Sequence, residues 1–458
     1  MNIIMSPTLN PETSAILQAF YSRSDESIQH RLQDLTENQQ KVLESLRKYY
    51  IGYGHKSIGD CGTITIYLED ISILAVKVIQ QHPLYNGQES STRYIDFNRP
   101  DRVYIPSDLS MSAHSLMLKW LQLYNLIHTE SSKHLFKTIK KPDSISETTY
   151  KNAILSAAFD KARGFLPTSV KTKASWTSTL STTREHFMTL LYHPFEEVRQ
   201  IAQTVLRQCI QMYPHSFKST DADIKNEAFQ AYWLEMFKTE QELPYQEFSS
   251  FIPPLASNKA LITTSNLDVF KTKKAKTLVN GTLEARVEHY SLPRFLNLVG
   301  TITVRGWLDF GSYRDFLRHR NMTSLLPLLT PGHGLHSFYL DFDQYLSTDS
   351  ELSVFQKYAD CIHEFEQCVA QESQQAAQYL YPLGWYVPIL TTAHLPQWAY
   401  VLELRTKQNV HPTLRLFCQN VYKQIQSVFK NSLNVDLKAS SIVNFKRGME
   451  TIITPTTE

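Results

Sequence analysis

The chain has 458 residues, more than one ordinary domain, so two domains are the first expectation. Its 42% hydrophobic and 20% charged residues are typical of a globular protein with a buried core. Lys and Arg outnumber Asp and Glu by only 46 to 44, and this net charge of +2 argues against a protein that coats nucleic acid or a membrane surface. Any bound anion must therefore be held by a local group of arginines.

The five cysteines form no Cys-x-x-Cys pair, and their odd number does not suit a disulfide framework. We predict reduced cysteines that pack as small hydrophobic side chains. The N-terminus lacks the basic-then-apolar pattern of a signal peptide, and the most apolar stretch, residues 71–79, is too short to span a bilayer. We therefore predict a soluble, cytoplasmic protein, and we predict no metal site.

Taken in chain order, the predicted elements mix strand and helix. Residues 63–68 are β-branched and aromatic, which predicts a strand, and residues 71–79 continue as a helix or a buried segment. Apolar residues with helical spacing follow at residues 154–165, 184–191, 198–212, 354–380 and 414–429. The mixture predicts a helix-rich α+β fold with an antiparallel or mixed sheet. No glycine-rich phosphate loop occurs, which disfavours Rossmann and kinase chemistry.

Three short patterns occur twice, in the same order. They are a Gly-Thr-Ile-Thr motif, a histidine about twenty residues later, and a His-Pro before a helical segment. The matched positions are Gly62 with Gly300, His82 with His319, and His193 with His411. Their offsets of 238, 237 and 218 residues are nearly constant, which indicates two diverged copies of one fold.

The repeat predicts a first domain at residues 1–250, a linker at 251–280 and a second domain at 281–458. The join contains Pro253-Pro254 and the basic run of residues 271–276, and it is poor in periodic apolar residues. The basic run has two possible interpretations, a solvated linker and a phosphate-binding tail. We expect the two copies to superpose, with Gly62 over Gly300.

A first charged cluster places Glu89, Ser91 and Arg93 at alternate positions of an extended segment. Together they offer an acceptor, a hydroxyl and a guanidinium fork, a set that suits a nucleotide. A solvated strand with a structural ion pair would show the same pattern.

A second charged cluster is Arg318-His319-Arg320, which follows two apolar residues. Two arginines around a histidine would attract a polyphosphate or an electron-rich ring system. A basic helix end is the alternative interpretation.

These two clusters, taken together, resemble the flavin-dependent thymidylate synthases, whose signature joins an R-H-R end to an E-x-S-x-R end. The first half of the chain keeps only E-x-S-x-R, with Gln81 and Pro83 at the R-H-R arginines. The second half keeps only R-H-R, with Thr330 at the position of the last arginine. The two copies have therefore lost opposite ends of the signature.

Further motifs extend the resemblance over roughly residues 10–215 and 285–430. Ala162-Arg163 with Leu166-Pro167 resembles the family's A-R-x-x-L-P, and Arg184 lies in a segment similar to its W-T-x-N-A-R-x-L-x-x-F-L-x-L-R. The closing L-x-L-R of that segment is matched only at Arg405. The family's second flavin-contacting histidine is replaced by Cys61, and its N-A-R asparagine occurs in neither half.

The resemblance implies a composite site, because family members are homotetramers whose active sites are shared between subunits. A fused chain would need each motif only once. One side would supply Arg318, His319, Arg320 and Arg405, and the other Glu89, Ser91, Arg93 and Arg163. Arg318 and Arg405 would be catalytic. The cofactor would be held by Arg318, His319, Arg320, Arg184 and Glu89, and the substrate by Glu89, Ser91, Arg93, Arg163 and Arg405.

The implied activity is the methylation of dUMP to dTMP, with FAD as cofactor and methylenetetrahydrofolate and NADPH as co-substrates. Ser91 would then be a phosphate ligand and not a nucleophile. Two fused chains would replace the four family subunits, so we expect a homodimer. Three alternatives stay open. They are a relative that acts on another pyrimidine nucleotide, a non-catalytic nucleotide-binding homologue, and a regulatory subunit of an active homologue.

Overall fold

The structure is a computed structural model, and it describes residues 9–22, 27–28, 32, 56–91, 97, 99–217, 220, 225–248, 261–265, 272–286, 292–429 and 433–449. The described residues form a helix-rich α+β protein with small sheets, as the sequence predicts. None of their helices has the length and apolarity needed to cross a membrane. All five cysteines are free thiols, and four of them are buried.

The chain divides into two compact units, each made of three separate segments. The first unit consists of Met1–Ile71, Val78–Glu89 and Lys173–Thr239. The second consists of Ser72–Lys77, Ser90–Thr172 and Glu240–Glu458. These units are defined by which residues contact one another in the folded chain, whereas the predicted domains are defined by a sequence repeat. The division into residues 1–250 and 281–458 therefore stays a prediction.

The first unit is built around a two-stranded sheet of β1 (Thr63–Ser72) and β2 (Lys171–Thr179). Its helices are α1 (Pro11–Tyr21), α4 (Lys56–Gly59), α8 (Leu180–Leu190), α9 (Glu196–Met212), α10 (Pro214–Phe217) and most of α12 (Glu227–Phe248). Helix α9 begins with two acidic residues in its first turn, and their negative charges stabilise the helix by interacting with the positive end of its dipole.

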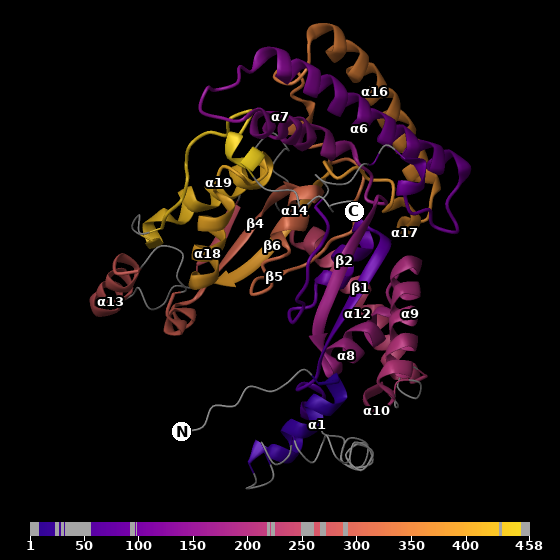
Figure 1. Cartoon of the computed structure of the whole chain (residues 1–458), viewed down its shortest axis with the longest axis vertical. Coiled ribbons are helices and arrows are strands. Elements are labelled where there is room, and N and C mark those ends of the chain that lie inside the picture. The colour runs from indigo at the N-terminus through magenta and orange to yellow at the C-terminus, as the bar shows by residue number, and fades with distance from the viewer. Residues whose placement is uncertain are drawn as a thin grey trace. The chain divides into compact units, whose positions relative to one another are not determined.

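The second unit contains a four-stranded antiparallel sheet in the order β3-β4-β6-β5. The strands are β3 (Leu261–Ser265), β4 (Thr301–Asp309), β5 (Thr323–Ser324) and β6 (Tyr386–His394). Its α-helices are most of α5 (Ile73–Gln80), then α6 (Met111–Thr138), α7 (Glu147–Ala162), α13 (Lys273–Glu284), α14 (Phe310–Phe316), α15 (Ser337–Leu340), α16 (Thr348–Gln371), α17 (Gln374–Ala377), α18 (Leu395–Arg405) and α19 (Pro412–Phe429). Short 3-10 turns are η3 (Pro100–Arg102), η4 (Arg163–Phe165), η6 (Arg294–Val299) and η7 (Phe445–Met449). Figure 1 shows β4, β6 and β5 next to one another and the long helices α6 and α16 side by side.

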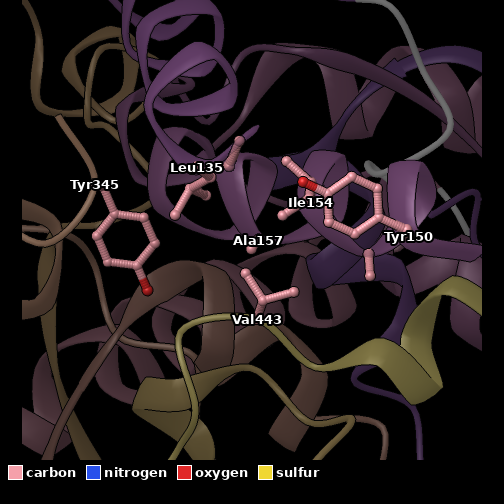
Figure 2. Packing of buried hydrophobic residues seen from close by; sticks show 8 residues of the cluster. Leu135, Tyr150, Ile154, Ala157, Tyr345 and Val443 are labelled. Atoms are coloured by element: carbon pink, nitrogen blue, oxygen red, sulfur yellow. The ribbon is translucent and has the colours of Figure 1, made fainter. Parts of the chain in front are cut away.

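A buried apolar cluster joins α6, α7 and the C-terminal segment of the second unit. Figure 2 shows Leu135, Ile154 and Ala157 facing Tyr345 and Val443. Side chains three and four residues apart on α7 point to one face, so this helix buries a continuous stripe there. Residues more than three hundred positions apart, such as Leu135 and Val443, thus share one core.

Most of the predicted elements are confirmed, and one is wrong. The strand at residues 63–68 is part of β1, and the apolar segment 71–79 becomes α5. The single helix predicted at 354–380 is interrupted, because Glu372 is extended and Ser373 caps a new helix by accepting from the backbone N–H of Ala376 at 3.1 Å. Within the predicted linker, residues 261–265 form β3, and α13 begins at Lys273.

The same local order, strand then helix then histidine, occurs in both predicted copies. Strand β1 leads into α5 and His82, and β4 leads into α14 and His319. Two backbone hydrogen bonds of the second unit occur again at equivalent positions of the same unit. Ile73 N donates to Val170 O at 3.0 Å, and its equivalent Phe310 N donates to Trp385 O at 2.9 Å. Likewise, Leu74 N donates to Thr168 O at 3.2 Å, and Gly311 N donates to Leu383 O at 2.7 Å. An antiparallel bridge also joins Pro167 to its counterpart Pro382.

The two repeated glycines are required for different reasons. At Gly62, an added Cβ would lie 2.3 Å from the carbonyl oxygen of Pro11. At Gly300, φ is 137°, a backbone conformation that side chains other than glycine rarely adopt. Both positions immediately precede a strand, so each glycine sets the direction in which that strand begins.

Candidate functional site

A cavity of about 820 Å³ lies in the second unit and is lined mainly by η6, by the turn after α14 and by α18. Five of its lining residues are arginines: Arg286, Arg294, Arg318, Arg320 and Arg405. None of the described residues that line it is acidic. Such a concentration of guanidinium groups without carboxylates favours a ligand with several negative charges.

The R-H-R triplet (residues 318–320) reaches the cavity because α14 ends just before it. Asp309 caps the start of α14 by accepting from the backbone N–H of Ser312 at 2.9 Å. Phe316, near the end of this helix, is buried and packs against Trp398. The chain then turns, since His319 N donates to Phe316 O at 3.1 Å. All three residues of the triplet line the cavity, the histidine buried and the first arginine exposed.

Arg405, the last residue of α18, is oriented by two hydrogen bonds. Its Nε donates to Nε2 of His319 at 2.8 Å, and its Nη2 donates to the carbonyl oxygen of Asp315 at 2.8 Å. Because arginine has no acceptor, Nε2 of His319 must carry the lone pair, and the ring proton is on Nδ1. The triplet and Arg405, which are 86 residues apart in the sequence, are therefore joined directly.

The Asp315 carboxylate lies among several guanidinium groups. Burial would raise its pKa, but neighbouring arginines hold the pKa well below its usual range. These arginines are Arg314, Arg163, Arg405 and Arg318. The carboxylate therefore stays ionised and partly balances the positive charge behind the cavity wall.

Burial, with the charge of Arg405, lowers the pKa of His319 from 6.5 to about 3. The unfolded chain therefore binds this proton more tightly than the folded chain. The free energy of unfolding should be insensitive to this histidine above pH 6.5 and should fall as the pH drops from 6.5 towards 3. Urea unfolding at several pH values between 7 and 4.5 measures the slope.

The variant His319→Gln isolates the contribution of this one histidine to that slope. It should reduce the slope by up to one proton, about 1.4 kcal/mol per pH unit, even if it lowers stability at every pH. An unchanged slope in the variant would contradict a neutral, buried His319.

A buried ion pair holds one arginine of the cavity wall in place. The two Nη atoms of Arg286 donate to the two carboxylate oxygens of Glu403 at 2.6 and 2.7 Å. Glu403 also accepts from the backbone N–H of Asn434 at 3.1 Å. Glu403 itself does not line the cavity, so this carboxylate holds Arg286 in the wall without offering negative charge to a ligand.

Arg163 belongs to the second unit but is not among the residues that line the cavity. It is buried, donates from Nη2 to Oγ of Ser312 at 2.9 Å, and lies 3.8 Å from the carboxylate of Asp315. Since Asp315 in turn accepts from Arg405, Arg163 contacts the same network from behind the wall.

The remaining predicted site residues lie elsewhere. Glu89 and Arg184 belong to the first unit, where Glu89 pairs with Ala174 of β2 and Arg184 donates from Nε to Oγ1 of Thr220 at 3.1 Å. Ser91 is exposed in the second unit and is not part of the cavity lining. Arg93 lies outside the described residues.

The counterpart of the triplet in the first copy has a different character. Around His82, the rings of Trp176 and His186 stack with centroids 4.8 Å apart, and the His82 and His186 rings are also 4.8 Å apart. Burial lowers the pKa of His186 to about 3, so this ring is neutral at ordinary pH. Neutral rings here replace the cationic surface around His319.

Sequence reasoning missed several residues of the cavity. Arg286, Arg294 and Tyr400 were not predicted, because they lie outside the family motifs. A weak signal existed for Tyr400, since Pro396, Tyr400 and Leu404 are four residues apart in the sequence, the spacing of one helix face, and the structure places them on α18. No local pattern marks Arg286 or Arg294.

The chain is similar to one family model over residues 4–215 and to UPF0159 proteins over most of its length. A family model described as thymidylate synthase complementing protein matches residues 4–215. A UPF0159 protein of Chlamydia pneumoniae is 22% identical over 453 residues, which cover 90% of this chain and 83% of that protein. A UPF0159 protein of Thermoplasma acidophilum is 22% identical over 473 residues, with 90% and 92% covered.

Among solved structures, the chain is similar to the UMP/dUMP methylase PolB from Streptomyces cacaoi, whose crystal structure was determined bound with 5-Br dUMP. The two are 15% identical with a TM-score of 0.29, over 46% of this chain and 90% of that chain. From the family match, residues 4–215 of this chain are similar to the thymidylate synthase complementing protein family, that is, the flavin-dependent thymidylate synthases.

Proposed function

We propose that the chain is a flavin-dependent thymidylate synthase-like enzyme that methylates dUMP to dTMP, with methylenetetrahydrofolate as the one-carbon donor. One observation carries the proposal: the R-H-R triplet and Arg405, matched to the family from separate parts of the sequence, line one concave cavity that has no acidic lining residue among those described. The family match of residues 4–215 supports the same reaction class. The finer choices of substrate and co-substrates rest on the resemblance.

The donor set fits the ligands that the proposal requires. FAD and dUMP both carry phosphate groups, and five arginines line a cavity of about 820 Å³. Guanidinium groups bind phosphate through paired, charge-assisted hydrogen bonds. His319 is neutral, and with its Nε2 engaged by Arg405 it has only the Nδ1 proton to donate. It can therefore donate to a ligand without adding charge.

In this proposal the chain binds and orients, and its arginines stabilise negative charge that develops on the ligands. Arg318 and Arg405 would polarise the reacting groups. The cofactor would be held by Arg318, His319 and Arg320, with Arg184 and Glu89 as further contacts. The nucleotide would be held by Arg405 together with Glu89, Ser91, Arg93 and Arg163. When bound, reduced FAD supplies the redox chemistry and the transfer of the one-carbon unit, and NADPH renews its reduced form.

We also propose that the chain is a fusion of two diverged family copies, with a composite site formed within one chain or between two. The repeated hydrogen bonds of the second unit support a duplication, as does the alignment of relatives over about 90% of the chain. A homodimer would then bring together four copies, which is the number in the family tetramer.

Purification of the chain tests the proposal directly. The protein should be yellow, with a flavin absorbance spectrum, and should form dTMP from dUMP when methylenetetrahydrofolate and NADPH are added. The same sample should have the mass of two chains by light scattering.

Replacing both arginines of the triplet by alanine should remove the colour, whereas replacing Arg207, an exposed arginine of α9, by alanine should leave it. A colourless protein that still binds dUMP would instead favour a non-catalytic nucleotide-binding homologue.

A further inference from the structure

One wall of the cavity is apolar, in contrast to the arginines that line the rest. Pro396, Tyr400 and Leu404 are spaced four residues apart on α18 and all line the cavity. The opposite face of this helix is buried in the core through residues that include Trp398 and Leu402. Helix α18 therefore presents a narrow apolar strip to the cavity and ends in Arg405.

Tyr400 is the most exposed of the three residues in this strip, since Pro396 and Leu404 are half-buried. Its side chain is 53% exposed, whereas Leu292, another apolar residue of the lining, is 8% exposed. The Tyr400 ring makes an edge-type contact with the buried ring of His319, with centroids 6.0 Å apart and planes at 73°. This contact holds one side of the tyrosine ring against the R-H-R triplet.

A single exposed tyrosine on a surface needs no explanation. Tyr400 differs because it lines a concave site together with five arginines, of which Arg286 is ion-paired with Glu403. A bare phosphate or a sugar phosphate would use the arginines and leave the aromatic wall in contact with water. A planar heteroaromatic ring would cover that wall and exclude the water.

We propose that Tyr400 is a specificity-determining residue that stacks on the planar ring of a phosphorylated heteroaromatic ligand, so that the cavity selects nucleotides over sugar phosphates. The proposal rests on the proposed function, since it concerns the same cavity, and it adds a residue and a basis of selection that lie outside the family motifs. The arginines then supply affinity for the phosphate, and Tyr400 supplies the preference for a base.

Calorimetric titration of the full-length chain with two matched ligands tests this. The ligands are dUMP and 2-deoxyribose 5-phosphate, which differ only in the base. Wild-type protein should bind dUMP at least tenfold more tightly. Tyr400→Leu should weaken dUMP binding about tenfold and change sugar phosphate binding less than twofold, because stacking on an aromatic side chain contributes roughly that much per base. Tyr400→Phe keeps the ring and should retain the preference for dUMP.

Phe355→Leu is the matched control, because Phe355 is a similarly exposed aromatic residue on α16 and is not among the lining residues. It should change neither affinity. Equal loss of both ligands in Tyr400→Leu, equal affinity of wild-type protein for the two ligands, or no binding of either would overturn the proposal. If the expected pattern appears in a protein without flavin or methylation activity, the stacking role stands and the proposed reaction fails.

Discussion

Replacing Arg405 by alanine should weaken dUMP binding by roughly 1.5–3 kcal/mol, which corresponds to about 10- to 150-fold in affinity. The guanidinium group is a predicted substrate contact, and it also donates to His319 and to the carbonyl of Asp315. Its loss removes a charge-assisted contact and leaves the histidine without the donor that fixes its tautomer. Calorimetric titration of dUMP into wild-type and variant protein measures the change.

Two kinds of control make the Arg405 result specific. Arg207→Ala removes the same charge from an exposed site on α9 and should leave the affinity unchanged. Changes at Gln81 or Thr330, which occupy positions where the family signature has arginine, should also have little effect, whereas Arg93→Ala should match Arg405→Ala. If changes at Gln81 or Thr330 weaken dUMP binding as much as changes at Arg93 or Arg405, the predicted division of the motif between the two copies is wrong.

Replacing Arg163 by methionine should lower the free energy of unfolding by about 3–5 kcal/mol. Arg163 is buried, donates to Ser312 at 2.9 Å, and is one of the cations that keep Asp315 ionised. Methionine fills a similar volume but leaves the Asp315 carboxylate with less compensating charge. Urea unfolding monitored by tryptophan fluorescence gives the difference, and Arg163→Lys should lose less because it keeps the charge.

The Arg163 result also decides between two roles for this residue. The sequence resemblance predicts a substrate contact, whereas the contacts in the structure indicate support for the network behind the cavity. A variant that keeps wild-type stability and loses only dUMP affinity would favour the substrate contact. A variant that loses stability but regains dUMP affinity under strongly stabilising conditions would favour the supporting role.

Much of the local structure could be predicted from the sequence, because it depends on neighbours in the chain. The β-branched run at residues 63–68 becomes β1, and the apolar spacing at residues 198–212 and 414–429 becomes α9 and α19. The predicted repeat rests in part on Gly62 and Gly300, and in the structure each of these glycines directly precedes a strand. The R-H-R triplet was identified from residue types alone, and the structure adds that it follows directly on α14.

Two features of the secondary structure were not predicted, although both depend on residues close together in the sequence. The 28-residue helix α6 was not predicted, although its buried residues recur every three or four positions. The split between α16 and α17 was also missed. The apolar pattern continues across it, and the interruption depends on the Ser373 cap rather than on a proline or glycine.

By itself, the sequence determined the class of fold, the family resemblance and the four motif residues that line the cavity, and it predicted two related copies. Only the tertiary structure decided that Arg286, Arg294 and Tyr400 join them and that Arg163 is buried behind the wall. The physical reason is that periodicity and motifs report how a residue relates to its neighbours in the chain. Whether a guanidinium faces a cavity or a buried carboxylate depends on which elements pack together, and here residues 163, 315 and 405 meet only after folding.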